Sequence, residues 1–252
     1  MKLTLEIWRQ AARGTPGAFV RYPLDGLDPG MSILEMLDHL NESLIAGGAD
    51  PVAYESDCRE SVCGACGITV NGRPHGGTAH TTTCMQRLRQ FEDAQLVRLE
   101  PLRAHTFPVI RDLVVDRSAL DRVLAAGASV AIDAGQAPDA DATPDTQETV
   151  EAALDYAACI GCGACVAACP NGSAYLFTGA KLTHLGLLNL PSLQKRARAI
   201  SMTTVAEDEF GPCSLYGECL EVCPASIPEA ALTAPGHERL LAAFENKAVR
   251  AR

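Results

Sequence analysis

Eleven cysteines lie in spaced groups along this chain of 252 residues, and they constrain the fold more than any other feature. Because the number is odd, the cysteines cannot all pair into disulfides. Residues 1–10 contain no apolar segment behind a basic stretch, and no run of about 18 apolar residues occurs anywhere, so we expect neither a secretory signal nor a membrane span. In a reducing cytoplasm structural disulfides are rare, so we expect metal ligands, catalytic groups or buried thiols.

The composition excludes several classes of function. Aromatic residues make up 5% of the chain, which leaves little for base-stacking platforms. A formal net charge of −10 at pH 7 opposes binding to nucleic acid and to anionic lipid headgroups. We therefore expect no nucleic-acid partner, and contact with a membrane only through another protein. The hydrophobic content of 47% suffices for ordinary cores, and the length suits about two domains.

The first cysteine group has the spacing C-x4-C-x2-C with a distant fourth member, formed by Cys58, Cys63, Cys66 and Cys84. This is the plant-type ferredoxin pattern for a [2Fe-2S] cluster. Small residues between the cysteines allow backbone N–H groups to approach the sulfurs. Zinc is the alternative, although its usual pattern is two C-x2-C pairs.

Two histidines, His75 and His80, lie between the third and fourth cysteines of this group. They raise the alternative of a Rieske centre, in which two histidines replace two cysteines. We do not favour it, because four cysteines are already present. The histidines are expected to be exposed polar residues of a glycine-rich loop.

The remaining seven cysteines form two related runs. The first is C-x2-C-x2-C-x3-C-P, the bacterial ferredoxin run, in which the fourth cysteine serves the other cluster. The second run fits the same spacing, with Tyr216 in the slot of the middle cysteine. Exchanging the fourth cysteines gives four ligands for a [4Fe-4S] cluster and three for a [3Fe-4S] cluster. The [4Fe-4S] ligands are Cys159, Cys162, Cys165 and Cys223, and the [3Fe-4S] ligands are Cys169, Cys213 and Cys219.

The pattern of apolar residues predicts an α+β chain. We expect a plant-type ferredoxin-like (β-grasp) domain at residues 1–125, a linker at 126–147, and a mostly α-helical bacterial-ferredoxin-like domain at 148–252. Ser32 and Glu35 have the spacing of a helix capping box. The expected strands are 3–7, 18–22, 68–70 and 96–99, and the expected helices include 33–44, 108–124 and 237–247.

No catalytic residue is predicted, because the chain carries no glycine-rich dinucleotide fingerprint. Clusters exchange electrons singly, so the chain is interpreted as an electron relay. The whole pattern resembles the iron-sulfur subunit of succinate dehydrogenase or fumarate reductase. The resemblance includes the segments Cys58–Gly64 and Phe107–Arg117.

This resemblance implies partners and a place in the cell. It implies a flavoprotein subunit with FAD that interconverts succinate and fumarate, as in the tricarboxylic acid cycle, and a membrane-anchor cytochrome b subunit with haem b. The chain would then lie peripherally on the cytoplasmic face of the cell membrane, held by the anchor subunit. A quinone would bind near the [3Fe-4S] cluster, with Pro170 and Tyr216 as its neighbours.

One departure from the family pattern concerns the quinone. Ala174 stands where the best-known members carry a Trp that contacts ubiquinone, so that contact is not carried over. The loop between Cys66 and Cys84 and the run 170–174 are more similar to the branch with a single membrane-anchor subunit, and menaquinone is our hypothesis.

Three alternatives remain at this stage: the iron-sulfur subunit of another flavin-linked oxidoreductase, a free ferredoxin-like carrier, and a structural zinc protein. The apolar segment 182–190 is too short to span a bilayer and is either an anchor contact or a core helix.

Overall fold

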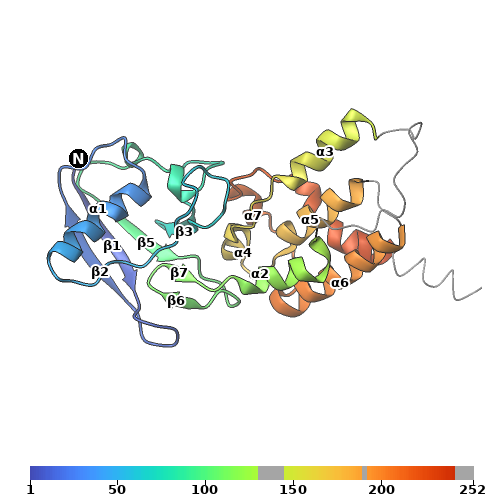
Figure 1. Ribbon diagram of the computed structural model, residues 1–252, viewed down its shortest axis with the longest axis horizontal. Helices are drawn as coiled ribbons and strands as arrows, with labels where there is room; N and C mark the ends of the chain where they lie inside the picture. The colour runs from blue at the N-terminus through green and yellow to red at the C-terminus, as the bar shows by residue number, and fades with distance from the viewer. Residues whose placement is uncertain (130–144, 189–191, 242–252) are drawn as a thin grey trace, which may run out of the picture. The chain divides into compact units, whose positions relative to one another are not determined.

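A computed structural model describes residues 1–129, 145–188 and 192–241 of the chain (Figure 1). The chain forms two compact units. The first unit consists of residues 1–117 together with two short segments from later in the chain, 160–168 and 221–225. The second unit contains the rest. This division differs from the expected domains, because both short segments belong with the N-terminal part. Residues 130–144 of the expected linker lie outside the described residues.

The first unit contains a mixed five-stranded sheet in the order β2-β1-β5-β3-β4. Strands β1 and β5 pair in parallel, whereas β1 and β2 form an antiparallel hairpin. Leu3, Leu5 and Ile7 of β1 are buried on one face, as the alternation predicts, and Glu6 of the same strand is buried as well. The strands are β1 (Leu3–Arg9), β2 (Ala18–Leu24), β3 (Ile68–Val70), β4 (Arg73–Pro74) and β5 (Gln95–Pro101).

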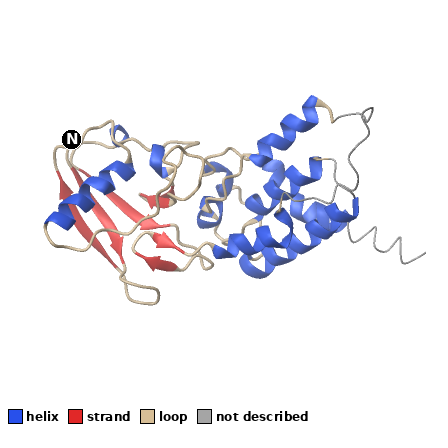
Figure 2. Cartoon of the chain, viewed as in Figure 1, coloured by secondary structure: helices blue, strands red, loops and turns tan. Residues whose placement is uncertain are grey.

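Helix α1 (Ile33–Ala46) packs on this sheet and shares its core (Figure 2). The predicted capping box is present, since the Glu35 N–H donates to the Ser32 hydroxyl at 3.2 Å and the Ser32 N–H donates to the Glu35 carboxylate at 2.6 Å. Four apolar residues of its first two turns are buried between helix and strands: Ile33, Leu34, Met36 and Leu37.

The segment 108–124 differs from the expectation of one helix. It forms a two-stranded hairpin, β6 (Val109–Arg111) and β7 (Val114–Val115), and helix begins only at α2 (Ser118–Val123), followed by the π-helix η3 (Leu124–Ala128). Asp112, with φ at 46°, turns the hairpin. Its carboxylate is 3% exposed and accepts from the N–H groups of Gln10 at 2.9 Å and Ala53 at 2.9 Å. These long-range bonds favour the turn over a helix.

The second unit is built from helices, as predicted (Figure 2). Small residues allow close approach: a Cβ on Gly179 would lie 1.7 Å from the backbone oxygen of Ala231. Leu182 and Leu185 are buried, so the described part of the segment 182–190 is a core helix, whereas 189–190 lie outside the described residues. The longer elements are α3 (Gln147–Ala157), α5 (Tyr175–Leu187), α6 (Ser192–Phe210) and the 3-10 helix η4 (Glu229–Leu232).

The end of the chain is described only in part. Residues 234–241 are helical, so this helix starts three residues before the expected position 237, and the expected residues 242–247 lie outside the described ones. Among the described residues, no helix combines the length and apolarity required to cross a membrane.

Candidate iron-sulfur sites

The first cysteine loop runs from residue 58 to strand β3 in the first unit. Its backbone N–H groups point at sulfur: Glu60 N lies 3.3 Å from the Sγ of Cys58, and Ala65 N lies 3.4 Å from the Sγ of Cys63. Such N–H groups stabilise the negative charge of thiolates. Three positions in the loop have a left-handed backbone: Arg59 (φ 56°), Ser61 (φ 62°) and Gly64 (φ 73°).

The fourth cysteine of this group, Cys84, lies in the short 3-10 helix η1 (Thr83–Met85). The Thr82 hydroxyl is 3.0 Å from its Sγ. Cys66 and Cys84 are 3% and 4% exposed, and burial raises the pKa of Cys66 to about 11, with the charge of Cys84 adding to the effect. The pKa of Cys58 is lowered to about 7 by N–H groups of the loop and by the neighbouring Cys63 thiol.

Within this group, the Cys63 thiol acts on the pKa of Cys58, and Cys84 acts on the pKa of Cys66. A cluster with two irons and four thiolate ligands requires two thiolates for each iron. The donor set and the inward N–H groups fit a [2Fe-2S] cluster.

An ion-pair network ties the first cysteine loop to helix α1. The guanidinium of Arg59 donates two bonds to the Asp38 carboxylate at 2.5 and 3.1 Å, and the Tyr54 hydroxyl donates to the same carboxylate. A bidentate arginine fixes geometry as well as charge. Sequence reasoning did not identify these partners, because Asp38 lies 21 residues before Arg59.

His75 corrects one expectation. It is 1% exposed, and burial, followed by the charge of Arg117, lowers its pKa to about 4. The Nδ1 atom accepts from the N–H of Thr83 at 3.4 Å, whereas Nε2 is buried without a hydrogen-bond partner. His75 folds inward because its backbone is left-handed (φ 65°) and its N–H donates to the carbonyl of Ile68 at 2.8 Å. His80 is exposed, as expected.

The members of the second cysteine group belong to both units. Cys162, Cys165 and Cys223 belong to the first unit, and Cys159 ends a segment of the second unit. Cys165 lies in helix α4 (Ala164–Ala168), and Cys162 and Cys223 are buried. In the second unit, Lys181 Nζ donates to the carbonyl of Cys159 at 2.9 Å.

The third group, Cys169, Cys213 and Cys219, lies within the second unit. Burial raises the pKa of Cys219 to about 11, and the charges of Cys213 and Cys169 raise it further. The N–H of Leu215 lies 3.3 Å from the Sγ of Cys213. Three thiols of this kind fit a cluster with three ligated irons.

The two cysteine runs share one local backbone pattern. In each, the second and fourth residues after the first cysteine are left-handed, and a short helix starts at the fifth, α4 in one and α7 (Glu218–Glu221) in the other. The first run has glycine at both positions, but the second has Leu215 at one, so a strained conformation is kept without glycine. The left-handed residues are Gly161 (65°), Gly163 (83°), Leu215 (57°) and Gly217 (93°).

Tyr216 and Pro170 are both exposed, Tyr216 by 62%. Their two segments are joined by a bond of 2.7 Å from the Asn171 amide to the Ser214 hydroxyl. Tyr216 therefore lies at the surface of the third cysteine group.

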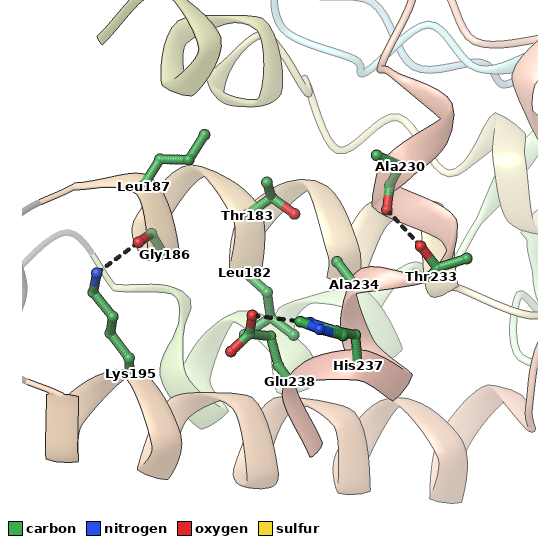
Figure 3. A pocket seen from close by; sticks show the side chains of 10 residues that line it. All are labelled: Leu182, Thr183, Gly186, Leu187, Lys195, Ala230, Thr233, Ala234, His237 and Glu238. Carbon is green, nitrogen blue, oxygen red and sulfur yellow. Dashed lines mark hydrogen bonds and ion pairs between the residues drawn. The ribbon is translucent and has the colours of Figure 1, made fainter. Parts of the chain in front are cut away.

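A pocket of about 440 Å³ in the second unit contains none of the eleven cysteines (Figure 3). It is lined by α5, α6, η4 and the helical residues 234–241. Its charged groups have partners: Lys195 Nζ donates to the Gly186 carbonyl at 2.6 Å, and His237 lies 3.6 Å from the Glu238 carboxylate. In the described ranges, no three His, Cys, Asp or Glu side chains are grouped to hold a single metal ion.

Comparison with known proteins defines the class. Residues 4–122 match the 2Fe-2S iron-sulfur cluster binding domain, and residues 158–227 match the 4Fe-4S dicluster domain. Together with the mixed sheet and the helical second unit, these matches define an iron-sulfur electron-transfer protein.

The relatives define the family within this class. The chain is 32% identical over 203 residues to the succinate dehydrogenase iron-sulfur subunit of Bacillus subtilis, covering 78% of this chain and 75% of that protein. It is 29% identical over 221 residues to the fumarate reductase iron-sulfur subunit of Escherichia coli O157:H7, covering 87% and 84%. A chain of the Mycobacterium smegmatis Sdh1 complex in the apo form matches with a TM-score of 0.69 and 25% identity, covering 97% and 96%. This protein belongs to the family of succinate dehydrogenase and fumarate reductase iron-sulfur subunits.

Proposed function

We propose that this chain is the electron-relay subunit of a succinate:quinone oxidoreductase. Oxidation of succinate to fumarate at the FAD of a flavoprotein subunit releases two electrons and two protons, and reduction of a membrane quinone to quinol takes up the same number. The [2Fe-2S], [4Fe-4S] and [3Fe-4S] clusters supply sites that accept and release electrons singly. The cysteines of this chain would hold those sites in place.

The incomplete third cysteine group is the observation that supports this proposal most directly. Its backbone follows the pattern of a complete run, but Tyr216 supplies a phenol where the complete run supplies a thiol. A phenol loses its proton far less readily than a thiol, so Tyr216 is a poor ligand for a fourth iron. Cys169, Cys213 and Cys219 are then the ligands of a [3Fe-4S] cluster.

Exposed apolar side chains on the cysteine loops support the proposed partners. Val62, 65% exposed, precedes Cys63 on the first loop and is suited to contact with the flavoprotein subunit. Leu215 and Tyr216, 59% and 62% exposed, lie on the third loop and are suited to the anchor subunit. Pro170 and Tyr216 are the proposed neighbours of the quinone, for which menaquinone remains our hypothesis. The anchor holds haem b and keeps this subunit on the cytoplasmic face of the membrane.

Potentiometric electron paramagnetic resonance (EPR) on the purified complex tests the relay. We expect three cluster signals, all of which respond to succinate or fumarate in a complex that retains the flavoprotein and anchor subunits. A free carrier would instead purify alone. Cluster signals that respond to neither succinate nor fumarate would indicate the subunit of another flavin-linked enzyme. A complex that contains zinc without iron would overturn the cluster assignment.

Substitution of the two quinone neighbours tests the terminal step. Pro170→Ala and Tyr216→Phe are expected to raise the KM for a menaquinone analogue, while Pro16→Ala, at an exposed turn of the β1–β2 hairpin, leaves it unchanged. Unchanged quinone kinetics in both variants would remove these residues from the site.

A further inference from the structure

Arg117 connects the backbones of two cysteine loops within the first unit. Its Nη1 donates to the carbonyl of Gly64 at 2.7 Å and to the carbonyl of Cys162 at 3.0 Å. Its Nη2 lies 3.4 Å from the carbonyl of Ala65. One guanidinium therefore bonds the loop that carries Cys63 to the loop that carries Cys162. Arginine suits this role because its donors form a rigid planar fork.

The two loops are in direct contact beside Arg117. A Cβ on Gly64 would lie 2.6 Å from the carbonyl oxygen of Ile160 and 3.1 Å from the Cα of Cys162, so only glycine fits there. A Cβ on Gly163 would lie 2.9 Å from the ring of Phe107 and 3.5 Å from the Cδ of Arg117. At Gly64 the two loops therefore approach each other too closely to admit a side chain.

Arg117 also brings a positive charge to this junction. Its guanidinium lies 2.8 Å from the Glu55 carboxylate. The side chain of Arg117 is 20% exposed, and that of Glu55 is 42% exposed. Because the cation is the more buried member of the pair, solvent screens it less than its partner. A cation favours the addition of an electron to a nearby centre, whereas a carboxylate opposes it.

We propose that Arg117 is a positioning residue for electron transfer between the cluster held by Cys63 and Cys66 and the cluster held by Cys162 and Cys165. It fixes the contact between the two ligand loops, and its charge raises the reduction potential of both clusters. This inference rests on the proposed assignment of the two clusters.

The test uses the purified complex and three substitutions. Arg117→Met removes the donors and the charge while keeping an unbranched, flexible side chain at this position. We expect the equilibrium constant for reduction of each cluster to fall about tenfold, which lowers each reduction potential by about 59 mV for a one-electron couple. Glu55→Gln removes the anion instead, so both potentials are expected to shift in the opposite direction. Arg21→Met is the matched control, because Arg21 is 68% exposed and pairs with Glu6 on the sheet; neither potential should move.

A second readout follows the contact between loops. Spin relaxation of the reduced [2Fe-2S] cluster is accelerated by a paramagnetic neighbour, and Arg117→Met is expected to change this acceleration. If Arg117→Met fails to assemble, Arg117→Lys keeps the charge without the fork and should change the relaxation with smaller shifts in potential.

The outcomes separate the two proposals. The role of Arg117 would be overturned if Arg117→Met left both potentials and the spin relaxation unchanged. If only Arg117→Lys assembles, unchanged spin relaxation in that variant would overturn it. A change confined to one cluster would also overturn it, because the guanidinium contacts both loops. If the wild-type complex shows no such pair of clusters, the proposed function itself fails.

Discussion

Tyr216 is the residue at which the cysteine pattern of the second run is interrupted. Tyr216→Cys places a thiol in the slot of the missing ligand, on a loop whose backbone already follows the complete run. We expect the [3Fe-4S] EPR signal of the oxidised complex to disappear and a [4Fe-4S] signal to replace it on reduction. Its potential should fall, because a fourth thiolate adds negative charge.

Leu215→Cys is the control for this substitution. Leu215 is also exposed, and it lies one residue away from the slot. A thiol there adds the same chemistry at the wrong offset, so the [3Fe-4S] signal should persist. If Tyr216→Cys keeps the wild-type signal, the assignment of the vacant slot is wrong.

His75 predicts a loss of stability in mild acid. Its folded pKa of about 4 lies below the ordinary histidine value of 6.5, so the unfolded chain binds the proton more tightly. The stabilisation is complete above pH 6.5 and decreases as the pH falls towards 4. By about pH 5.5 the loss should be about 1 kcal/mol. Thermal unfolding of the purified complex, followed by the visible spectrum of the clusters, measures it.

His75→Asn should reduce this pH dependence, since asparagine tolerates the left-handed backbone and does not titrate. His80→Asn makes the same change at an exposed left-handed position (φ 54°) and should keep the wild-type profile. Equal pH dependence in all three proteins would contradict the assignment to His75.

At the scale of elements, we expect substitution of glycine by alanine to have opposite effects at two positions of helix α5. Gly179→Ala places a Cβ 1.7 Å from the backbone oxygen of Ala231, so η4 must move, and overpacking of this kind costs roughly 1–3 kcal/mol. Gly186→Ala meets no atom within 4 Å and gains up to about 1 kcal/mol of helix propensity. Thermal unfolding should show the first variant below wild type and the second at or above it. Equal midpoints would contradict the close contact between α5 and η4.

Elements with local signals could be predicted from the sequence. The capping box at Ser32 located helix α1, and alternation located strand β1. The segment 108–124 could not be predicted, because its apolar spacing fits a helix while Asp112 is held by bonds to residues more than 50 positions away. Propensity was overridden there by tertiary contacts.

The same limit applies to the sites. The family and the cluster-binding domains could be predicted from cysteine spacing and are confirmed by the comparisons. The ligand assignment of each cysteine stays a prediction. The hydrogen-bond partners of Arg59 and Arg117 could not be predicted from the sequence. A guanidinium that donates to distant carbonyls or carboxylates leaves no periodic signal in a sequence.

At the scale of the whole molecule, the cysteine number predicts a ratio of iron to sulfide. In the proposed assignment, four, four and three ligands account for all eleven cysteines and correspond to clusters of two, four and three irons. A [3Fe-4S] cluster keeps its four sulfides but has lost one iron. The chain should therefore contain about nine iron atoms and about ten acid-labile sulfides.

Anaerobic purification of the complex with iron and sulfide analysis, after subtraction of haem iron, measures this ratio. Because one vacant slot causes the deficit, Tyr216→Cys should bring the two numbers into equality at about ten each. Leu215→Cys should leave them unequal. Equal numbers in the wild-type complex would mean that a non-cysteine ligand holds a fourth iron at the third site, and Tyr216 or solvent would then be that ligand.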